Sequence, residues 1–182
     1  MHDMTAAHLR SAFGGESMAH MRYRVWGAKA KADGFPHVAR LFRAVSEAEL
    51  VHATHHFHAM AGVAGAFPVT SMAGFGLGTT SENLAGAIEG ETFEIDEMYP
   101  VYKEAAQSQG EKAAVLSFHY ALAAEKTHQA LFTGAKKAID QGKDVALGLV
   151  SICGRCGHTL EGPIPDKCPI CAVGKDHYTT VA

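Results

Sequence analysis

Glu49-Leu50-Val51-His52 and Glu125-Lys126-Thr127-His128 carry the same two ionisable side chains at the same spacing, three residues apart. Residues three apart share one face of an α-helix. Leu41 and Val45 lead up to the first pair at helical spacing, and Phe118 leads up to the second. Each Glu-x-x-His pair therefore lies on the apolar face of its predicted helix, where an uncompensated carboxylate is costly.

Four long helices are predicted around these pairs, because the apolar periodicity is interrupted mainly at glycines. The predicted helices cover residues 5–33, 35–61, 81–110 and 111–142. Pro100 is expected to kink the third. Residues 62–80 are rich in Gly, Ala, Ser and Thr and predict a long crossover between the second and third helices. Four helices with one long crossover indicate a mainly α fold, the ferritin-like form of the four-helix bundle.

The other two helices also carry glutamates on their apolar faces. Glu16 shares a face with Leu9, and Glu91 shares one with Leu84, with Glu94 one turn further along. Glu16 precedes Glu49 by 33 residues, and Glu91 precedes Glu125 by 34. Two similar helix pairs related by a pseudo-twofold axis would bring these carboxylates together at the bundle centre.

Such a buried group of carboxylates needs compensation, because each isolated buried charge costs several kcal/mol. Two divalent cations would supply it. One glutamate from each of two helices and a Glu-x-x-His pair from each of the other two form the di-iron carboxylate constellation. A single Glu-x-x-His pair would more simply be an exposed, salt-bridging helix face. Two such pairs at matched spacing favour the metal site.

All four cysteines lie in the last thirty residues, as Cys153-x-x-Cys156 and Cys168-x-x-Cys171. Two such pairs are typical of a tetrathiolate site for zinc or a single iron. The surrounding segment has few large apolar residues, so the metal is expected to supply much of its folding energy. The chain is therefore predicted to divide into a bundle over 1–142 and a cysteine module over 148–182.

Composition excludes several other classes of protein. Apolar residues make up 47% of the chain, which is enough for a packed core and argues against disorder. The formal net charge of −3 gives no broad basic surface, so no nucleic-acid partner is expected. No run of eighteen apolar residues and no signal pattern occur, so we expect no membrane partner and a cytoplasmic location.

Several further motifs accompany these clusters over nearly the whole chain. They are Gly15-Glu16-Ser17, Arg22-Tyr23, Glu47-x-Glu49-x-x-His52, Glu82-Asn83-Leu84, Gly90-Glu91-x-x-Glu94, Glu97-Met98-Tyr99-Pro100, Glu125-x-x-His128 and the two cysteine pairs. With them the chain resembles the rubrerythrin family. The resemblance implies a ferritin-like bundle with a non-haem di-iron site and a C-terminal rubredoxin-like iron centre.

The resemblance also implies roles for particular residues. The implied di-iron ligands are Glu16, Glu49, Glu91, Glu94, Glu125 and His128. Glu49 and Glu125 would bridge the two irons, while His52 and Glu94 would exchange as ligands of one iron with its oxidation state. Tyr23 and Tyr99 would donate hydrogen bonds to liganding carboxylates. Cys153, Cys156, Cys168 and Cys171 would bind one iron, with zinc as an alternative. His158 and Ala172 depart from the usual knuckle pattern, where an aromatic residue and a glycine are common.

The implied activity is that of a peroxidase that reduces hydrogen peroxide to water in oxidative-stress defence, with Glu94 and His52 as catalytic residues. Electrons would pass through the rubredoxin-type centre from a separate NAD(P)H-dependent reductase or a rubredoxin, since the chain has no Gly-x-Gly-x-x-Gly motif.

The resemblance implies a homodimer or larger oligomer, because the module is not expected to reach the di-iron site of its own bundle. The crossover over residues 62–80 is long enough to permit exchange of helices between chains. Two alternatives remain open. One is a ferroxidase that handles iron. The other is a non-enzymatic metal-binding protein with a zinc-ribbon tail.

Overall fold

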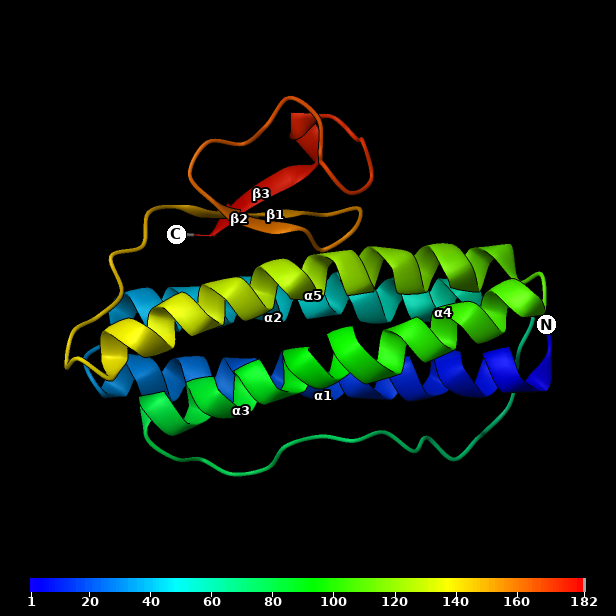
Figure 1. The fold of residues 1–182 in the computed structure, drawn as a ribbon, viewed down its shortest axis with the longest axis horizontal. Helices are drawn as coiled ribbons and strands as arrows, with labels where there is room; N and C mark the ends of the chain where they lie inside the picture. The colour runs from blue at the N-terminus through cyan, green and yellow to red at the C-terminus, as the bar shows by residue number, and fades with distance from the viewer. Residues whose placement is uncertain (182) are drawn as a thin grey trace.

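The computed structural model describes residues 1–181 as a bundle of long helices with a small β-sheet on one side (Figure 1). The helices are α1 (Asp3–Ala32), α2 (Pro36–Ala59), α3 (Thr80–Phe93), η1 (Glu94–Met98), α4 (Tyr99–Ser108), α5 (Lys112–Ile139) and η2 (Lys175–His177). The strands are β1 (Val150–Cys153), β2 (Thr159–Glu161) and β3 (Tyr178–Val181). They form an antiparallel sheet in the order β2-β1-β3.

Local sequence signals explain where the helices begin. Pro36 stands in the first turn of α2, where its missing N–H is tolerated. Thr79 and Glu82 form a capping box at α3: the Thr79 hydroxyl accepts from the Glu82 amide, and the Glu82 carboxylate accepts from the Thr79 amide at 2.8 Å. The capping box ends the long crossover that runs from residue 60 to residue 79.

Pro100 interrupts the third predicted helix in a particular way. Helix α3 passes into the π-helical turn η1, in which the Tyr99 amide donates to the Glu94 carbonyl five residues earlier, before α4 begins. Proline has no N–H to give to the carbonyl of residue 96, so the regular ladder cannot continue. The interruption begins at Glu94, a predicted ligand, and π-turns often occur at functional sites.

The cysteine module shares a core with the bundle. Leu147, Val150 and Ile152 belong to the same buried cluster as Phe42 and Phe132. This packing adds to the folding free energy that the metal was predicted to supply to this segment.

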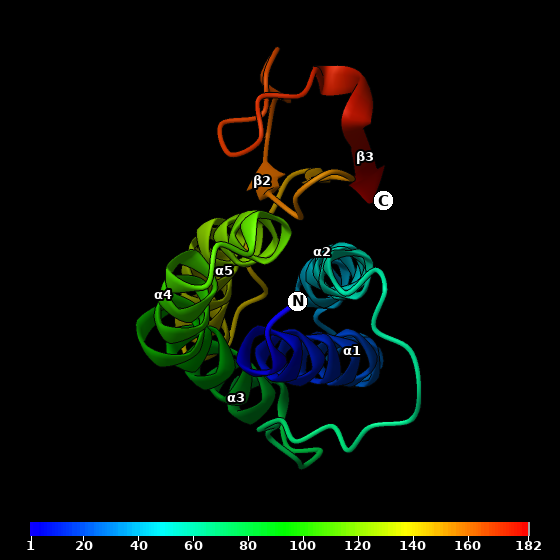
Figure 2. The same ribbon diagram turned by 90° about the vertical axis from the view of Figure 1, so that its right-hand side faces the viewer.

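The segment between α5 and β1 is fixed against α2. The Asp144 carboxylate accepts from the amides of His37 at 2.8 Å and Val38 at 3.3 Å, which caps the start of α2. Arg40 donates to the carbonyls of Leu147 and Gly148. The module consequently lies over α2 and α5 (Figure 2), while the crossover runs along the opposite side of the bundle (Figure 1). Within residues 1–181, none of the helices is both long enough and apolar enough to cross a membrane.

Candidate metal centres

Four buried glutamates meet at the centre of the bundle, one from each of α1, α2, α3 and α5. Ligand atoms of Glu16, Glu49, His52 and Glu125 all lie within 4.8 Å of one another, and so do those of Glu49, Glu91, Glu125 and His128. Every one of these side chains is buried. Glu49 and Glu125 belong to both groups, so they lie between two adjacent positions at which a cation fits.

The two histidines point the same ring nitrogen at the carboxylates. His52 Nδ1 lies 2.8 Å from Glu125 Oε1 and 2.9 Å from Glu49 Oε2. His128 Nδ1 lies 2.6 Å from Glu125 Oε2 and 3.4 Å from Glu49 Oε1. The Glu-x-x-His spacing thus places both imidazoles at the cluster, as a shared helix face requires.

The other ring nitrogen of each histidine faces the cysteine module. His52 Nε2 lies 3.1 Å from the carbonyl oxygen of Cys156, and His128 Nε2 lies 3.0 Å from Thr159 Oγ1. A carbonyl oxygen only accepts, so His52 carries its proton on Nε2 when neutral. That leaves the Nδ1 lone pair free for a metal. Sequence reasoning did not find Thr159 or the Cys156 carbonyl, because no local pattern indicates which distant loop packs on a helix.

Gly157 makes this close approach possible. A Cβ atom at this position would lie 2.1 Å from His52 Nε2, closer than non-bonded atoms come. Its φ of 76° also lies in the left-handed region that glycine adopts freely. The expectation that the module would not reach the di-iron site of its own bundle is therefore wrong for this structure. Residues 144–148 are held on α2 by hydrogen bonds to His37, Val38 and Arg40, so the short connection brings Cys156 directly to His52.

Two tyrosines link the halves of the bundle. Tyr23 on α1 donates to Glu91 Oε1 at 2.7 Å, and Tyr99 on α4 donates to Glu16 Oε1. Each tyrosine thus reaches the carboxylate of the other helix pair. These bonds hold one oxygen of each carboxylate and leave the second free.

A buried histidine extends the Tyr99 hydrogen bond. His56 Nε2 lies 2.9 Å from the Tyr99 hydroxyl, and His56 Nδ1 lies 2.8 Å from Ser117 Oγ. Tyr99 gives its only proton to Glu16, so His56 donates from Nε2 and accepts at Nδ1. Burial, followed by the charge of His52, lowers the pKa of His56 to about 3, which keeps the ring neutral as this pattern requires.

Glu94 does not join either compact group of ligand atoms. Its carboxylate lines a cavity on the crossover side, and part of the residue is accessible. Burial of the carboxylate, followed by the nearby charges of Glu16 and Glu125, raises its pKa well above the usual range. Glu94 thus faces the cluster from the cavity side, while His52 faces it from the module side.

The central cluster fits metal ions. Burial, followed by repulsion from Glu49 and Glu125, raises the pKa values of Glu16 and Glu91 well above those of ordinary carboxylates. Glu16 Oε2 and Glu91 Oε2 are buried and accept no hydrogen bond from the residues that the structure describes. Free oxygens beside two imidazole nitrogens are the donor set of a carboxylate-bridged pair of divalent cations.

The cysteine sulfurs fit a single tetrahedral ion. Their four Sγ atoms lie within 4.8 Å of one another; Cys153 and Cys171 are 3.7 Å apart, and Cys156 and Cys168 are 3.5 Å apart. A tetrahedron with metal–sulfur bonds of ~2.3 Å has edges of ~3.8 Å. The two residues that depart from the usual knuckle pattern, His158 and Ala172, both fit this geometry. His158 is buried with Nδ1 at 2.8 Å from the Tyr178 hydroxyl, and Ala172 takes the left-handed φ of 59°.

Together, the crossover-connected bundle and its buried carboxylate–histidine cluster define a ferritin-like di-iron carboxylate protein with an added tetrathiolate module. Solved structures confirm the mainly α, ferritin-like fold class. Reduced, all-ferrous nigerythrin aligns with a TM-score of 0.86 at 30% identity, over 99% of this chain and 88% of its own. A bacterioferritin from Rhodobacter capsulatus, 18% identical, shares the fold with a TM-score of 0.68 over 78% of this chain and 88% of its own.

The family follows from the sequence comparisons. The rubrerythrin family model matches residues 8–136. Rubrerythrin-2 of Clostridium acetobutylicum is 47% identical over 175 residues, which cover 96% of this chain and 95% of the relative. The chain therefore belongs to the rubrerythrin family of di-iron oxidoreductases. Its cofactor sites are a carboxylate- and histidine-bound di-iron site and a four-cysteine rubredoxin-like site.

The stability of the metal-free protein is expected to fall as pH rises from about 5 to 8. The pKa values of Glu16, Glu91, His52 and His128 are all raised in the folded state without metal. A raised pKa contributes stability below the ordinary pKa of the group, and this contribution is lost as pH rises toward the folded-state value. Glu125, whose pKa is lowered because His52 and His128 outweigh its burial, opposes the trend only below the ordinary carboxylate range.

Calorimetric melting of chelator-treated and iron-loaded protein tests this expectation. The Tm of the metal-free form should drop with pH. The loaded form should keep a nearly constant Tm, because iron replaces the protons at the cluster. A metal-free protein that becomes more stable between pH 5 and pH 8 would contradict the described charge balance.

Proposed function

We propose that this protein is a peroxidase that reduces hydrogen peroxide to water at its di-iron site in oxidative-stress defence, with electrons relayed through the four-cysteine iron. The hydrogen bond between Cys156 and His52 is the observation that carries the proposal, because it joins the two metal sites directly. A storage or ferroxidase centre has no need of such a connection.

Glu16, Glu49, Glu91, Glu125 and His128 are the proposed permanent ligands of the iron pair, with Glu49 and Glu125 as bridges. Membership of Glu49 and Glu125 in both groups of ligand atoms supports the bridging assignment. His52 and Glu94 are proposed to exchange at one iron. They approach the cluster from opposite sides, and the π-turn at Glu94 gives that carboxylate a backbone that differs from a regular helix.

Each part of the site has a defined task in the reduction. The carboxylate and histidine ligands would hold an iron pair, which would supply the two electrons of the reduction. Glu94, which faces both the cavity and the cluster, delivers protons to the departing oxygens. His52 holds its Nε2 proton on the Cys156 carbonyl and offers Nδ1 to the cluster. The balance is one hydrogen peroxide, two electrons and two protons giving two waters.

The electrons are proposed to come from NAD(P)H through a separate reductase or a rubredoxin. The rubredoxin-like module would accept them singly, and the carbonyl of Cys156, a residue that also supplies a sulfur to that module, would pass them to His52. A homo-oligomer and a cytoplasmic location belong to the same proposal.

Two other functions make different spectroscopic and kinetic predictions. A ferroxidase would oxidise iron with oxygen and would not need the tetrathiolate site. A non-enzymatic protein with a zinc-ribbon tail would be colourless. Visible thiolate-to-iron absorption of the purified protein would support the electron-transfer module, whereas stoichiometric zinc that iron cannot replace would exclude the relay.

Reduced protein mixed anaerobically with hydrogen peroxide should be oxidised much faster than the same protein mixed with oxygen. Glu94→Ala should remain folded but reduce peroxide about 100-fold more slowly, the usual scale for a lost acid–base group. Glu89→Ala is the matched control, because Glu89 is an exposed glutamate of the same cavity on α3. Stopped-flow absorbance follows both steps. Equal rates with the two oxidants would rule out the peroxidase function. Unchanged turnover of Glu94→Ala would rule out Glu94 as the proton donor.

A further inference from the structure

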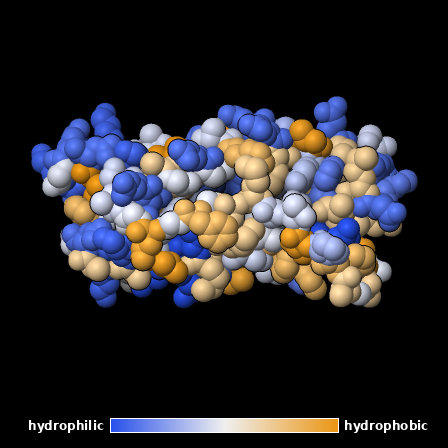
Figure 3. All heavy atoms as spheres, turned by 90° about the horizontal axis from the view of Figure 1, so that it is seen from below, coloured by the Kyte–Doolittle hydropathy of each residue, from blue (hydrophilic) through white to orange (hydrophobic). Residues whose placement is uncertain are grey.

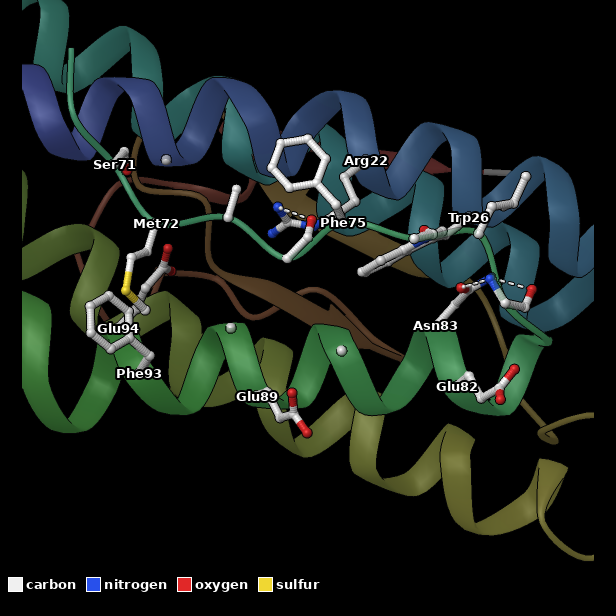
Figure 4. Close-up of a pocket in the computed structure, with 18 residues that line it drawn as sticks. Arg22, Trp26, Ser71, Met72, Phe75, Glu82, Asn83, Glu89, Phe93 and Glu94 are labelled. Carbon is white, nitrogen blue, oxygen red and sulfur yellow. Dashed lines mark hydrogen bonds between the residues drawn. The ribbon is translucent and has the colours of Figure 1, made fainter.

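A cavity of about 930 Å³ lies between α1, α3 and the crossover residues 71–78. Figure 4 shows the crossover segment passing over the cavity, with α1 on one side and α3 on the other. The crossover and the cysteine module lie on opposite sides of the bundle (Figure 1). The cavity therefore approaches the di-iron cluster from the side away from the electron donor.

One end of this cavity borders the di-iron cluster. Glu94 lines that end, beside Met72 and Phe93 in Figure 4. Gly15 and Gly90 also line it, and each directly precedes a carboxylate of the cluster, Glu16 or Glu91. Neither glycine has a side chain to fill the space between the helix and the crossover. A Cβ atom added to Gly15 would lie 3.0 Å from Ser71 Oγ on the crossover.

The remainder of the cavity is too large for hydrogen peroxide alone. Hydrogen peroxide needs roughly twice the ~30 Å³ that one water molecule occupies. A space of about 930 Å³ is in the range of sites for organic ligands. Its apolar lining residues include Trp26, Met72, Phe75 and Phe93.

The charged groups around the cavity favour a neutral ligand. Its ionisable lining residues are Glu82, Glu89 and Glu94 against the single cation Arg22. The Arg22 guanidinium lies over the Trp26 ring at 5.3 Å and reaches the Gly74 carbonyl at 3.5 Å, so much of its contact is with the protein itself. With Glu94 protonated, as its raised pKa favours, Glu82 and Glu89 still outnumber Arg22, and this negative charge disfavours anionic ligands.

The crossover above the cavity is tied at its ends and exposes apolar side chains between them. Ser11 Oγ donates to the Thr70 carbonyl at 2.8 Å, and Trp26 Nε1 donates to the Gly76 carbonyl at 2.9 Å. Between these ties Met72 is 73% exposed and Phe75 is 92% exposed. The face seen in Figure 3 carries apolar patches among its polar atoms. Such side chains gain stability by covering an apolar ligand.

We propose that this cavity binds the organic part of an alkyl or aryl hydroperoxide, so that the protein reduces organic hydroperoxides as well as hydrogen peroxide. The inference rests on the proposed peroxidase function. The hydroperoxide group faces Glu94, and the apolar group lies against Met72, Phe75 and Trp26. The O–O bond breaks, and one hydroperoxide, two electrons from the reduced di-iron site and two protons give one alcohol and one water.

Turnover of cumene hydroperoxide and hydrogen peroxide by the iron-loaded protein tests the proposal. The double variant M72S/F75S should lose about tenfold in kcat/KM for cumene hydroperoxide, which corresponds to ~1.4 kcal/mol of lost apolar contact. Its kcat/KM for hydrogen peroxide should stay unchanged. Phe57→Ser is the matched control, since Phe57 is a similarly exposed phenylalanine on α2, 60% accessible and outside this cavity. That variant should alter neither value.

Binding is measured separately in the metal-free protein. Trp26 is the only tryptophan of the chain, so its fluorescence reports on this cavity. Cumyl alcohol, the reduction product, should change Trp26 emission saturably, with a Kd about tenfold weaker in M72S/F75S. If hydrogen peroxide is reduced but cumene hydroperoxide is not, the inference is overturned and the peroxidase function stands. If neither is reduced, the peroxidase function fails. No saturable change in emission, or an equal loss for both peroxides in the double variant, also overturns the inference.

Discussion

Gly157→Ala is expected to slow electron delivery from the four-cysteine site to the di-iron site by about 100-fold, the scale of loss that a misplacement of ~1 Å can cause. The new Cβ atom would lie 2.1 Å from His52 Nε2 and 2.7 Å from His52 Cδ2. His52 is fully buried against the carboxylates and cannot withdraw, so the knuckle must move away. The 3.1 Å hydrogen bond from His52 Nε2 to the Cys156 carbonyl is then lost.

Gly162→Ala is the control that separates this contact from backbone strain. Gly162 belongs to the same module and has a φ of 91°, close in kind to the 76° of Gly157, but an added Cβ atom there meets nothing within 4 Å. Both variants carry the left-handed penalty of roughly 1–2 kcal/mol. Stopped-flow reoxidation of the cysteinyl iron after a peroxide pulse measures the transfer rate. Equal slowing in the two variants would show that strain, and not the approach to His52, sets the rate.

The two Glu-x-x-His pairs were predictable because a helix converts spacing into direction. Residues three apart share a face, so Glu49 with His52, and Glu125 with His128, had to point the same way once the apolar stripe was recognised. The matched spacing of Glu16 and Glu91 then indicated a common centre. The four cysteines were equally informative, because two knuckles at this spacing have few uses other than one metal.

The parts that sequence reasoning missed depend on packing between distant segments. Nothing near Thr159 or Gly157 indicates that either residue touches a histidine of the bundle. The docking depends on Asp144 capping α2 and on Val150 and Ile152 joining the core around Phe42. Such contacts involve residues about a hundred positions apart, and no local periodicity records them. The same limit explains why Pro100 predicted a kink, while the π-turn that begins at Glu94 was seen only in the structure.

Mixing two inactive variants is expected to restore no peroxidase activity. Glu125→Ala removes a carboxylate from both groups of ligand atoms, so the chain should keep its cysteinyl iron and lose di-iron turnover completely. Cys156→Ser should lose the cysteinyl iron and keep the di-iron site. In this structure the module lies on its own bundle, held by the Asp144 cap and by the bonds from Arg40 to Leu147 and Gly148. We therefore expect that a chain that lacks one site does not use the site of a neighbour.

Coexpression of the two variants with different affinity tags, followed by tandem purification, isolates any mixed oligomer for a reductase-driven peroxide assay. Cross-subunit delivery would make one of the two di-iron sites functional in each mixed dimer, which gives about half of the wild-type activity per dimer. Recovery near that level would show that the module serves a neighbouring bundle. Zero recovery with an intact red cysteinyl centre would show that the 3.1 Å contact between His52 and Cys156 is made within one chain. In that case peroxide and electrons reach each cluster from opposite faces of the same bundle, and oligomerisation is not needed for turnover.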